Sequence, residues 1–450
     1  MAMSKWSTLP LEIVDMFIDD LSRAESLQDL RNTCIVSRAC VPRCRKYLFR
    51  RVRVGKYGME DYSKFADFLR REALGGGRSV IESLNLFGNV VESKMTPLNT
   101  IGLVVCILSL LPRLKKLELT GIRFHSNLSD PMPSILPPLP KLDRLQLYIT
   151  TSGNDTASDP YNIIRLFPEI DHLHLYYSVY DETDGAAPAV IGPNTLPLNG
   201  NLKVRVLSMS NVPLGLHNRI MYDTSIAGSV RSVAVECGVI DEALGLSKFL
   251  SYARDGIEAL SIDLTPFLIM VDYDLSLPGM LLALPMTVDQ LTLTWRMIDE
   301  QHMLDVLIPG IKACTALREF DISLCFCPPE NDEDEYDSTV QWNCLIGLLS
   351  ELADDVEHVT IKFMVPHGGH YEFYHIEEPE FGKPHWWPTV SSLGLDWNAL
   401  KNQLERLEKL QELTIQNCEG TLWNVGQEDE AFITEELGTL SRILKFEDTT

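Results

Sequence analysis

Three cysteines lie within eleven residues near the start of the chain, in TCIVSRACVPRCRKYLFRRV, residues 33–52. Cys34, Cys40 and Cys44 are of the residue type that binds zinc, and the basic residues around them are of the type that binds nucleic acid. However, no C-x-x-C pair occurs, no fourth ligand is near, and Pro42 interrupts the segment. Aromatic residues are also too few for a nucleic-acid patch. The pattern therefore predicts a buried helical face with a solvated basic surface, and no metal.

A second group of possible metal ligands lies in VPHGGHYEFYHIEEPEFGKPHWW, residues 365–387. Histidines three residues apart can hold a metal, but glycine and proline interrupt this segment and provide no rigid geometry. We therefore interpret residues 366–395 as a long insertion between structural repeats, with aromatic side chains that could contact a partner. The ligands considered were His367, His370, His375, His385, Glu372 and Glu377.

A C-x-C pair, Cys325 and Cys327, precedes an acidic run at residues 330–337. Side chains alternate along a strand, so these two thiols share one side and are expected beside the core. The acidic run is interpreted as a solvated loop, with a docking site for a basic segment as the alternative.

Motifs that assemble a catalytic centre are absent from the sequence. It contains no G-x-S-x-G, no G-x-x-x-x-G-K-[ST] and no H-E-x-x-H. GGGRSV at residues 75–80 lacks the lysine and the preceding strand of a phosphate-binding loop, and indicates the end of a helix. We therefore predict no catalytic residues, no cofactor and no enzymatic activity.

Charge is distributed unevenly along the 450 residues, whose formal net charge is −24. Residues 1–56 contain eleven Lys or Arg and six Asp or Glu, a net +5, so the remainder carries −29. An acidic body of this size repels phosphate backbones, which argues against a nucleic-acid partner. The ten cysteines follow no disulfide pattern, the first residues lack a signal-peptide core, and the longest apolar stretch, residues 98–111, is too short to span a bilayer. We expect a cytoplasmic or nuclear protein without a membrane partner.

A repeat is visible in LPRLKKLEL from Leu111, LPKLDRLQL from Leu139 and FPEIDHLHL from Phe167, which start 28 residues apart. Between such segments lie stretches with helical periodicity that begin at an N-capping Asp or Ser, for example at Asp241, Asp299 and Ser338. A looser form, apolar-x-x-apolar-x-apolar, predicts further strands at Ile81–Leu86, Val204–Met209, Val230–Val235, Ile257–Ile262, Val288–Leu293, Leu317–Ile322, Val356–Ile361 and Leu410–Ile415.

A strand-plus-helix unit of this length is typical of leucine-rich repeats, stacked as a solenoid with a parallel sheet. The fold class is therefore α/β, with an irregular solenoid over residues 75–425, preceded by a connecting helix at 55–74. Residues 426–450 are expected to be an acidic cap or tail. The alternative is a layered α/β domain, which also alternates helix and strand.

Strand alternation also predicts which side chains face outward on this sheet. We expect a protein-binding face, and its target-binding residues are predicted to be Arg144, Tyr148, His172, His174 and Tyr176. The alternative is that these positions are polar only because they meet water. Other outward positions are Lys116, Glu118, Gln146 and, farther along, the acidic Glu236, Asp263 and Asp321.

Residues 7–54 resemble an F-box, in the version common among fungal F-box proteins. The resemblance rests on LPLEIVDMFIDDL from Leu9, whose apolar spacing predicts a helix, and on LRNTCIVSRACVPRCRKYLFRRVRV from Leu30, which includes a second helix and a restart at Pro42. Two positions depart from the family pattern: Cys40 stands where Trp is usual and Ser37 where Cys is common.

The resemblance implies three helices that dock on a Skp-family adaptor, and through it on a cullin and a ubiquitin-conjugating enzyme. The chain would then be the substrate-recognition subunit of an SCF-type ubiquitin ligase, with an unidentified protein target on its repeats. Because loss of the Trp removes a large apolar contact, the alternative is a leucine-rich-repeat scaffold with a vestigial F-box. The adaptor-binding residues that the resemblance implies are Leu9, Pro10, Ile13, Ile18, Leu21, Ile35, Val36 and Cys40.

Overall fold

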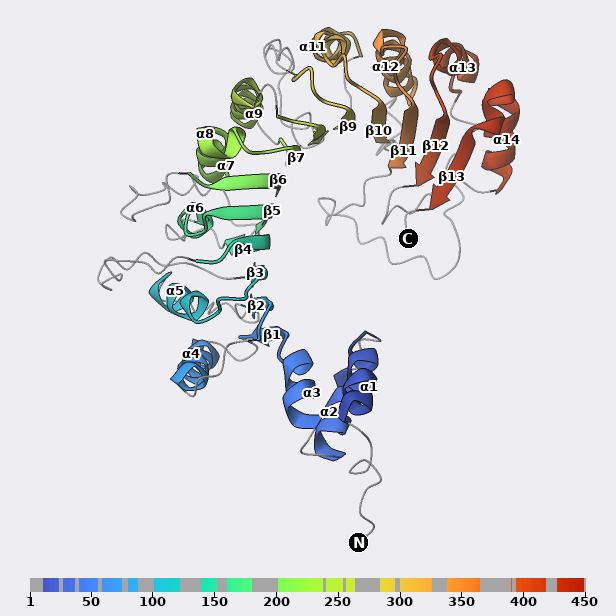
Figure 1. The fold of residues 1–450 in the computed structure, drawn as a ribbon. Coiled ribbons are helices and arrows are strands. Elements are labelled where there is room, and N and C mark those ends of the chain that lie inside the picture. The colour runs from blue at the N-terminus through green and yellow to red at the C-terminus, as the bar shows by residue number, and fades with distance from the viewer. Residues whose placement is uncertain are drawn as a thin grey trace, which may run out of the picture. The chain divides into compact units, whose positions relative to one another are not determined.

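Parallel strands alternating with helices make up most of the structure, which is a computed structural model (Figure 1). It describes residues 11–23, 27–36, 40–55, 59–74, 80–87, 101–121, 139–151, 160–179, 201–237, 240–253, 256–263, 284–295, 300–325, 338–364, 390, 394–417 and 427–448.

The described strands form a parallel sheet of thirteen strands, whose order in the sheet is their order in the sequence. Aliphatic residues at alternate positions point to the helix-covered side and are buried there, as Leu117 and Leu119 are in β3. The strands are β1 (Arg51–Val54), β2 (Ser83–Phe87), β3 (Lys116–Thr120), β4 (Leu142–Thr151), β5 (Glu169–Val179), β6 (Lys203–Ser210), β7 (Ser232–Glu236), β8 (Ala259–Asp263), β9 (Gln290–Trp295), β10 (Glu319–Cys325), β11 (His358–Met364), β12 (Glu412–Asn417) and β13 (Leu444–Asp448).

Helices precede the sheet and connect its strands. The helices are α1 (Leu11–Arg23), α2 (Leu27–Val36), α3 (Val41–Leu48), α4 (Met59–Leu74), α5 (Ile101–Ser109), α6 (Pro160–Ile164), α7 (Leu214–Met221), α8 (Thr224–Ala227), α9 (Ile240–Tyr252), α11 (Glu300–Ala313), α12 (Ser338–Glu351), α13 (Trp397–Arg406), α14 (Gln427–Leu437) and the 3-10 helix η4 (Gly438–Arg442).

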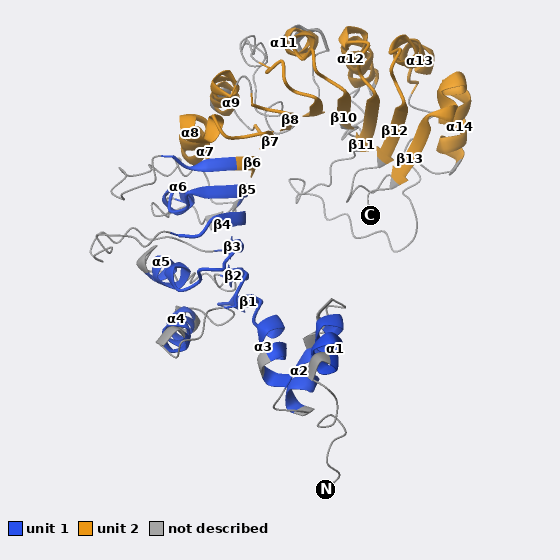
Figure 2. Ribbon diagram, in the orientation of Figure 1, with its two compact units in different colours: residues 1–204 blue, residues 205–450 orange. Residues whose placement is uncertain are grey.

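The chain divides into two compact units, residues 1–204 and 205–450, with the boundary inside β6 (Figure 2). In the first unit, α4, α5 and α6 lie on one side of its strands, and α1–α3 form a separate group of helices (Figure 1). In the second unit, the helices from α7 to α14 also lie on one side of the strands. The aliphatic core of each unit lies between its strands and these helices. None of these helices lies on the opposite side of the strands.

A backbone contact that recurs before many of the strands helps to set their register. The carbonyl oxygen of Glu82 accepts hydrogen bonds from the N–H groups of Lys115 and Lys116 at 2.8 and 3.0 Å. The carbonyl of Lys115 accepts from Asp143 and Arg144 in the same way, at 2.8 and 3.1 Å. Outward side chains of neighbouring strands therefore stand in straight rows. In the second unit the same contact is made by the carbonyls of Arg231, Glu258, Asp289, Arg318 and Glu357.

The α/β class and the parallel strands predicted from the sequence are confirmed, and each predicted strand lies within a few residues of an observed one. The helices expected within residues 98–111 and near Asp241, Asp299 and Ser338 are α5, α9, α11 and α12. Two of the expected N-caps are wrong, because Asp241 and Ser338 lie within α9 and α12. The sheet extends beyond residues 75–425 at both ends, because β1 pairs with β2 and β13 pairs with β12. The His-rich segment at 365–387, Cys327 and the acidic run at 330–337 lie outside the described residues.

Candidate protein-binding surfaces

The three N-terminal helices enclose a small apolar core. Five of its side chains are at most 5% exposed: Val14, Ile18, Leu30, Cys40 and Cys44. A core of this size is small for an independently stable fold, so other contacts must contribute to the stability of the group. Four partly buried side chains pack against it: Leu21, Cys34, Tyr47 and Leu48.

The cysteines in this group belong to the core. Burial, followed by a hydrogen bond with Cys34, raises the pKa of the Cys44 thiol to about 12. Cys40 is only 2% exposed. A thiol whose pKa is raised by burial is less reactive than an exposed one, so Cys44 acts as a core residue. Among the described residues, no group of three or more His, Cys, Asp or Glu side chains is arranged to hold a metal ion.

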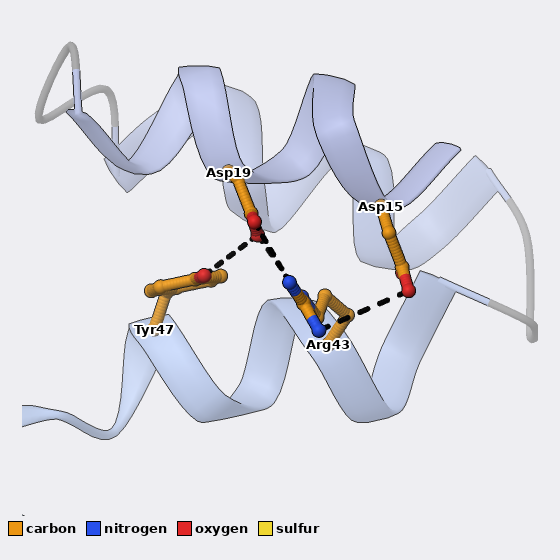
Figure 3. A network of polar contacts seen from close by, with 4 residues as sticks. All are labelled: Asp15, Asp19, Arg43 and Tyr47. Atoms are coloured by element: carbon orange, nitrogen blue, oxygen red, sulfur yellow. Dashed lines mark hydrogen bonds and ion pairs between the residues drawn. The ribbon is translucent and has the colours of Figure 1, made fainter. Parts of the chain in front are cut away.

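A polar cluster joins α1 to α3 beside this core (Figure 3). Arg43 donates from Nε and Nη2 to the two carboxylate oxygens of Asp19, at 3.0 and 2.7 Å, and Tyr47 donates its hydroxyl proton to Asp19 at 2.6 Å. Asp15 lies 3.8 Å from Arg43 Nη1. The hydrogen bond with Asp19 raises the pKa values of both Arg43 and Tyr47, so both donors keep their protons at neutral pH.

Large apolar side chains remain exposed on α1 and α2. Ile13 is 48% exposed, Met16 62% and Phe17 43%, while Ile35 on α2 is 84% exposed. On α1 these residues follow the i, i+3, i+4 spacing of one helical face. We call Ile13, Met16, Phe17 and Ile35 the exposed apolar group. Large apolar side chains that stay exposed on small helices are typical of a surface that binds a partner.

Two residues predicted to bind the adaptor are core residues instead. Ile18 is fully buried and Cys40 is 2% exposed, so neither side chain can reach a partner in this conformation. Leu21 is partly buried against the same core. The reason is the width of the apolar face of α1: Val14, Ile18 and Leu21 repeat at i, i+4 and i+7 and point inward, which leaves the neighbouring face outside.

The other predicted adaptor-binding residues stand as follows. Leu9 and Pro10 lie outside the described residues, Val36 is the last residue of α2, and Ile13 and Ile35 are exposed. Met16 and Phe17, which the prediction omitted, complete the exposed apolar group on α1. Their spacing from Ile13 is the signal in the sequence that would have identified them.

A second candidate surface lies on the outward side of β1–β5. The pairing register aligns residues of these strands in three rows, one behind another along the strand direction. The first row contains Arg51, Ser83, Lys116, Arg144 and His172, the second Arg53, Asn85, Glu118, Gln146 and His174, and the third Phe87, Thr120, Tyr148 and Tyr176. We call these three rows the cationic–aromatic face.

The five predicted target-binding residues come together on this face. The ring of Tyr148 lies 5.9 Å, between centroids, from the rings of both His174 and Tyr176. The Gln146 amide donates to the Tyr148 hydroxyl at 3.2 Å. Burial, with the positive charge of Arg144 beside it, lowers the pKa of His174. His174 is therefore neutral at pH 7, and its ring contributes to the aromatic surface.

The outward positions become acidic in the second unit, as the sequence indicated. Glu236 and Asp263 are paired in register on β7 and β8. Burial, and then the negative charge of Asp263, raises the pKa of Glu236 to about 7. Asp321 on β10 forms an ion pair with Lys362 of β11 at 3.1 Å.

Comparison with protein-family models and with curated proteins finds no match to this chain. None of the helices in the described ranges is long and apolar enough to cross a bilayer. The case for function therefore rests on the two candidate surfaces.

Proposed function

We propose that this chain is the substrate-recognition subunit of an SCF-type ubiquitin ligase. In this proposal α1–α3 are an F-box that docks on a Skp-family adaptor, and the strand–helix units are an irregular leucine-rich-repeat solenoid that binds the target protein. The chain itself would catalyse nothing. It would raise the concentration of the target near a conjugating enzyme that the cullin holds.

The observation that carries the proposal is the exposed apolar group. A three-helix unit with a core of only five buried residues would be more stable if it buried more apolar side chains. Ile35 is nevertheless 84% exposed and Met16 62% exposed. Burying these side chains against a partner would be favourable by about 1.5–3 kcal/mol each. The basic charge of residues 1–56 also complements the acidic adaptors of the family.

The alternative is a repeat scaffold whose F-box no longer binds an adaptor. Cys40 is the observation that favours it, because this residue replaces the usual Trp and its side chain is 2% exposed in the helical core. In the alternative, the target-binding face would act without any ubiquitin transfer.

Titration calorimetry of the purified chain against a Skp-family adaptor tests the proposal. We expect Met16→Glu and Ile35→Glu each to raise the Kd by at least about tenfold, the lower end of the energy of burying one such side chain. Met286→Glu is the matched control, because Met286 is a methionine of nearly the same exposure, 64%, in the second unit. Because all three side chains already meet water, the thermal unfolding of the variants should match that of the unchanged chain.

Leu9→Ala/Pro10→Ala is a second test of the same interface. Submicromolar binding that these variants abolish and Met286→Glu preserves would support the adaptor function. Absence of binding by the unchanged chain would contradict it and leave the scaffold alternative.

A further inference from the structure

The cationic–aromatic face differs in charge from the rest of the molecule. Its rows contain four permanent cations, Arg51, Arg53, Lys116 and Arg144, and one carboxylate, Glu118. Counting only Lys, Arg, Asp and Glu, this face carries a formal +3, on a chain whose formal net charge is −24. A local field opposite in sign to that of the whole protein selects an acidic partner at this face.

Two of the cations on the face, Lys116 and Arg144, lack the carboxylate partners that neighbouring cations have within the described residues. At the entry edge of the same strands, Arg50 lies 2.9 Å from Glu82, and Lys141 lies 2.7 Å from Glu169. In contrast, neither Lys116 nor Arg144 forms an ion pair with any residue that the structure describes, and both are exposed. Their charges are therefore available to a ligand without first breaking an internal salt bridge.

An aromatic row runs parallel to the cationic row on the same face. Tyr148 and Tyr176 contact each other through their rings, and Tyr176 is 38% exposed. Phe87 lies in the same row and is covered by the guanidinium of Arg53, 5.9 Å from its centroid. A ligand that spans both rows needs negative charge on one side and an aromatic or large apolar side chain on the other.

We propose that the cationic–aromatic face binds an acidic peptide segment that also carries aromatic side chains. The inference rests on the proposed function, because it names the class of target segment that the repeats would recognise. From β1 to β5 the face spans four strand spacings of about 4.8 Å, or about 19 Å. Six residues of extended chain cover about 20 Å, so a peptide of six to eight residues matches the face.

Single-stranded nucleic acid also combines negative charge with flat rings, and basic faces with aromatic residues bind it. Glu118 argues against this ligand, because its carboxylate lies next to the cationic row, between Asn85 and Gln146 in register. A phosphate backbone carries a charge at every nucleotide, whereas a peptide can place an uncharged residue beside Glu118. A phosphate backbone would also meet repulsion from the net charge of −24, whereas a short peptide meets mainly the local field.

Fluorescence anisotropy with the full chain tests the inference. The probe is a fluorescein-labelled octapeptide of alternating Asp and Tyr, compared with the same peptide containing Asn for Asp, and with octauridylate. We expect the acidic peptide to bind at least tenfold more tightly than the Asn peptide, and its affinity to fall as salt is raised from 0.05 to 0.5 M. Equal binding of the Asn peptide, or tighter binding of octauridylate, would overturn the inference.

Charge-reversing variants locate the binding site. Arg144→Glu and Lys116→Glu should each weaken binding about tenfold, and Tyr176→Ala about fivefold, while Arg442→Glu on η4 is the matched control and should change it less than twofold. Thermal unfolding of each variant shows whether the fold persists, and Tyr176→Ala tests the site without a new charge. Equal effects of Arg144→Glu and Arg442→Glu would refute this location.

The two proposals fail in distinguishable ways. Peptide binding is measured without the adaptor, and adaptor binding without the peptide. If the adaptor does not bind but the acidic peptide does, the function as a ligase subunit fails and the ligand class stands. If only the adaptor binds, the inference about the face fails alone.

Discussion

Replacing Glu236 by Gln should stabilise the protein in a way that depends on pH. Burial and the neighbouring Asp263 raise the pKa of Glu236 from 4.5 to about 7, although the backbone N–H of Asn211 and the side chain of Ser210 hydrogen-bond to it and act in the opposite direction. At neutral pH the folded protein therefore holds a carboxylate where a neutral group is preferred. Gln supplies the neutral group at every pH.

The sign and the pH window follow from the two pKa values. Between pH 4.5 and 7 the unfolded chain loses the proton of Glu236 while the folded chain keeps it. The contribution of this group to stability is thus fully present below pH 4.5, falls through this window and is constant above about pH 8. The Gln variant lacks this dependence. Its unfolding free energy therefore exceeds that of the unchanged chain by an amount that increases as the pH rises.

The expected size of the difference comes from the same shift. At about 1.4 kcal/mol per pKa unit, the shift from 4.5 to about 7 has a ceiling of about 3.5 kcal/mol. Since the side chain is only half-buried, solvent screening reduces this by about half, and we expect about 1.5 kcal/mol above pH 8 and almost none at pH 4.

Urea unfolding followed by tryptophan fluorescence, at pH values from 4 to 8.5, measures this difference. Trp342 and Trp397 are buried in the same unit as Glu236 and report on it. Glu408→Gln removes a charge at an exposed position and controls for the change in net charge. A difference of equal size at pH 4 and pH 8 would refute the raised pKa of Glu236, and with it the effects that we assign to burial and to the charge of Asp263.

Two further substitutions test other parts of the structure. Gly55→Ala should lower the unfolding free energy by about 3 kcal/mol or more, because φ is +113° and the new Cβ would overlap the carbonyl oxygen of Phe87. Gly394→Ala is the control: φ is +65° and no atom lies within 4 Å of the new Cβ, so it should cost about 1 kcal/mol. Equal losses of unfolding free energy for the two variants on urea unfolding would contradict this prediction. His217 is 1% exposed, and burial lowers the pKa of its imidazole to about 4. The contribution of this group to stability is therefore present above pH 6.5 and is lost as the pH falls to 4. The unfolding free energy of His217→Leu in urea at pH 4 should therefore exceed that of the unchanged chain by about 2 kcal/mol. If acidification to pH 4 lowered the unfolding free energies of both proteins equally, the prediction would be wrong.

The effects of Glu236 and His217 on stability oppose each other over almost the same pH window. Stability from Glu236 falls as the pH rises from 4.5 to 7, while stability from His217 rises between 4 and 6.5. The two contributions therefore partly cancel in the unchanged chain, and only the single variants separate the two groups.

The strands were predictable because a Leu-x-Leu pair can be buried on one side of a strand whatever surrounds it. Leu117, Leu145 and Leu173 open such pairs, and all are at most 1% exposed. β1 and β13 were missed for a different reason. Each is the end strand of the sheet, pairs on one side only and contains charged residues such as Arg51 and Lys445, so its pattern of burial is weak.

The residues of the outward face were predictable because strand alternation alone determines them, and pairing without a register shift places them in rows. The N-terminal surface was predicted less well, since apolar periodicity identifies a broad helical face and cannot say which part a small core will cover. Ile18 and Ile13 are both isoleucines on that face, yet one is buried and the other is 48% exposed. Only the packing of α2 and α3 distinguishes them.

The division of apolar residues in α1–α3 is itself an argument for a partner. Ile13, Met16 and Phe17 remain 43–62% exposed, and the surface that they leave in water adds nothing to the stability of the helical group. The cluster of Asp19, Arg43 and Tyr47 instead joins α1 to α3 by hydrogen bonds, which leaves this apolar face of α1 uncovered. A helical group held together in this way can present its apolar surface in a fixed geometry, so that binding need not first order the helices. If α1–α3 bind an adaptor as we propose, the polar cluster would hold the exposed apolar group in place for that contact, and disrupting either should weaken the same interaction.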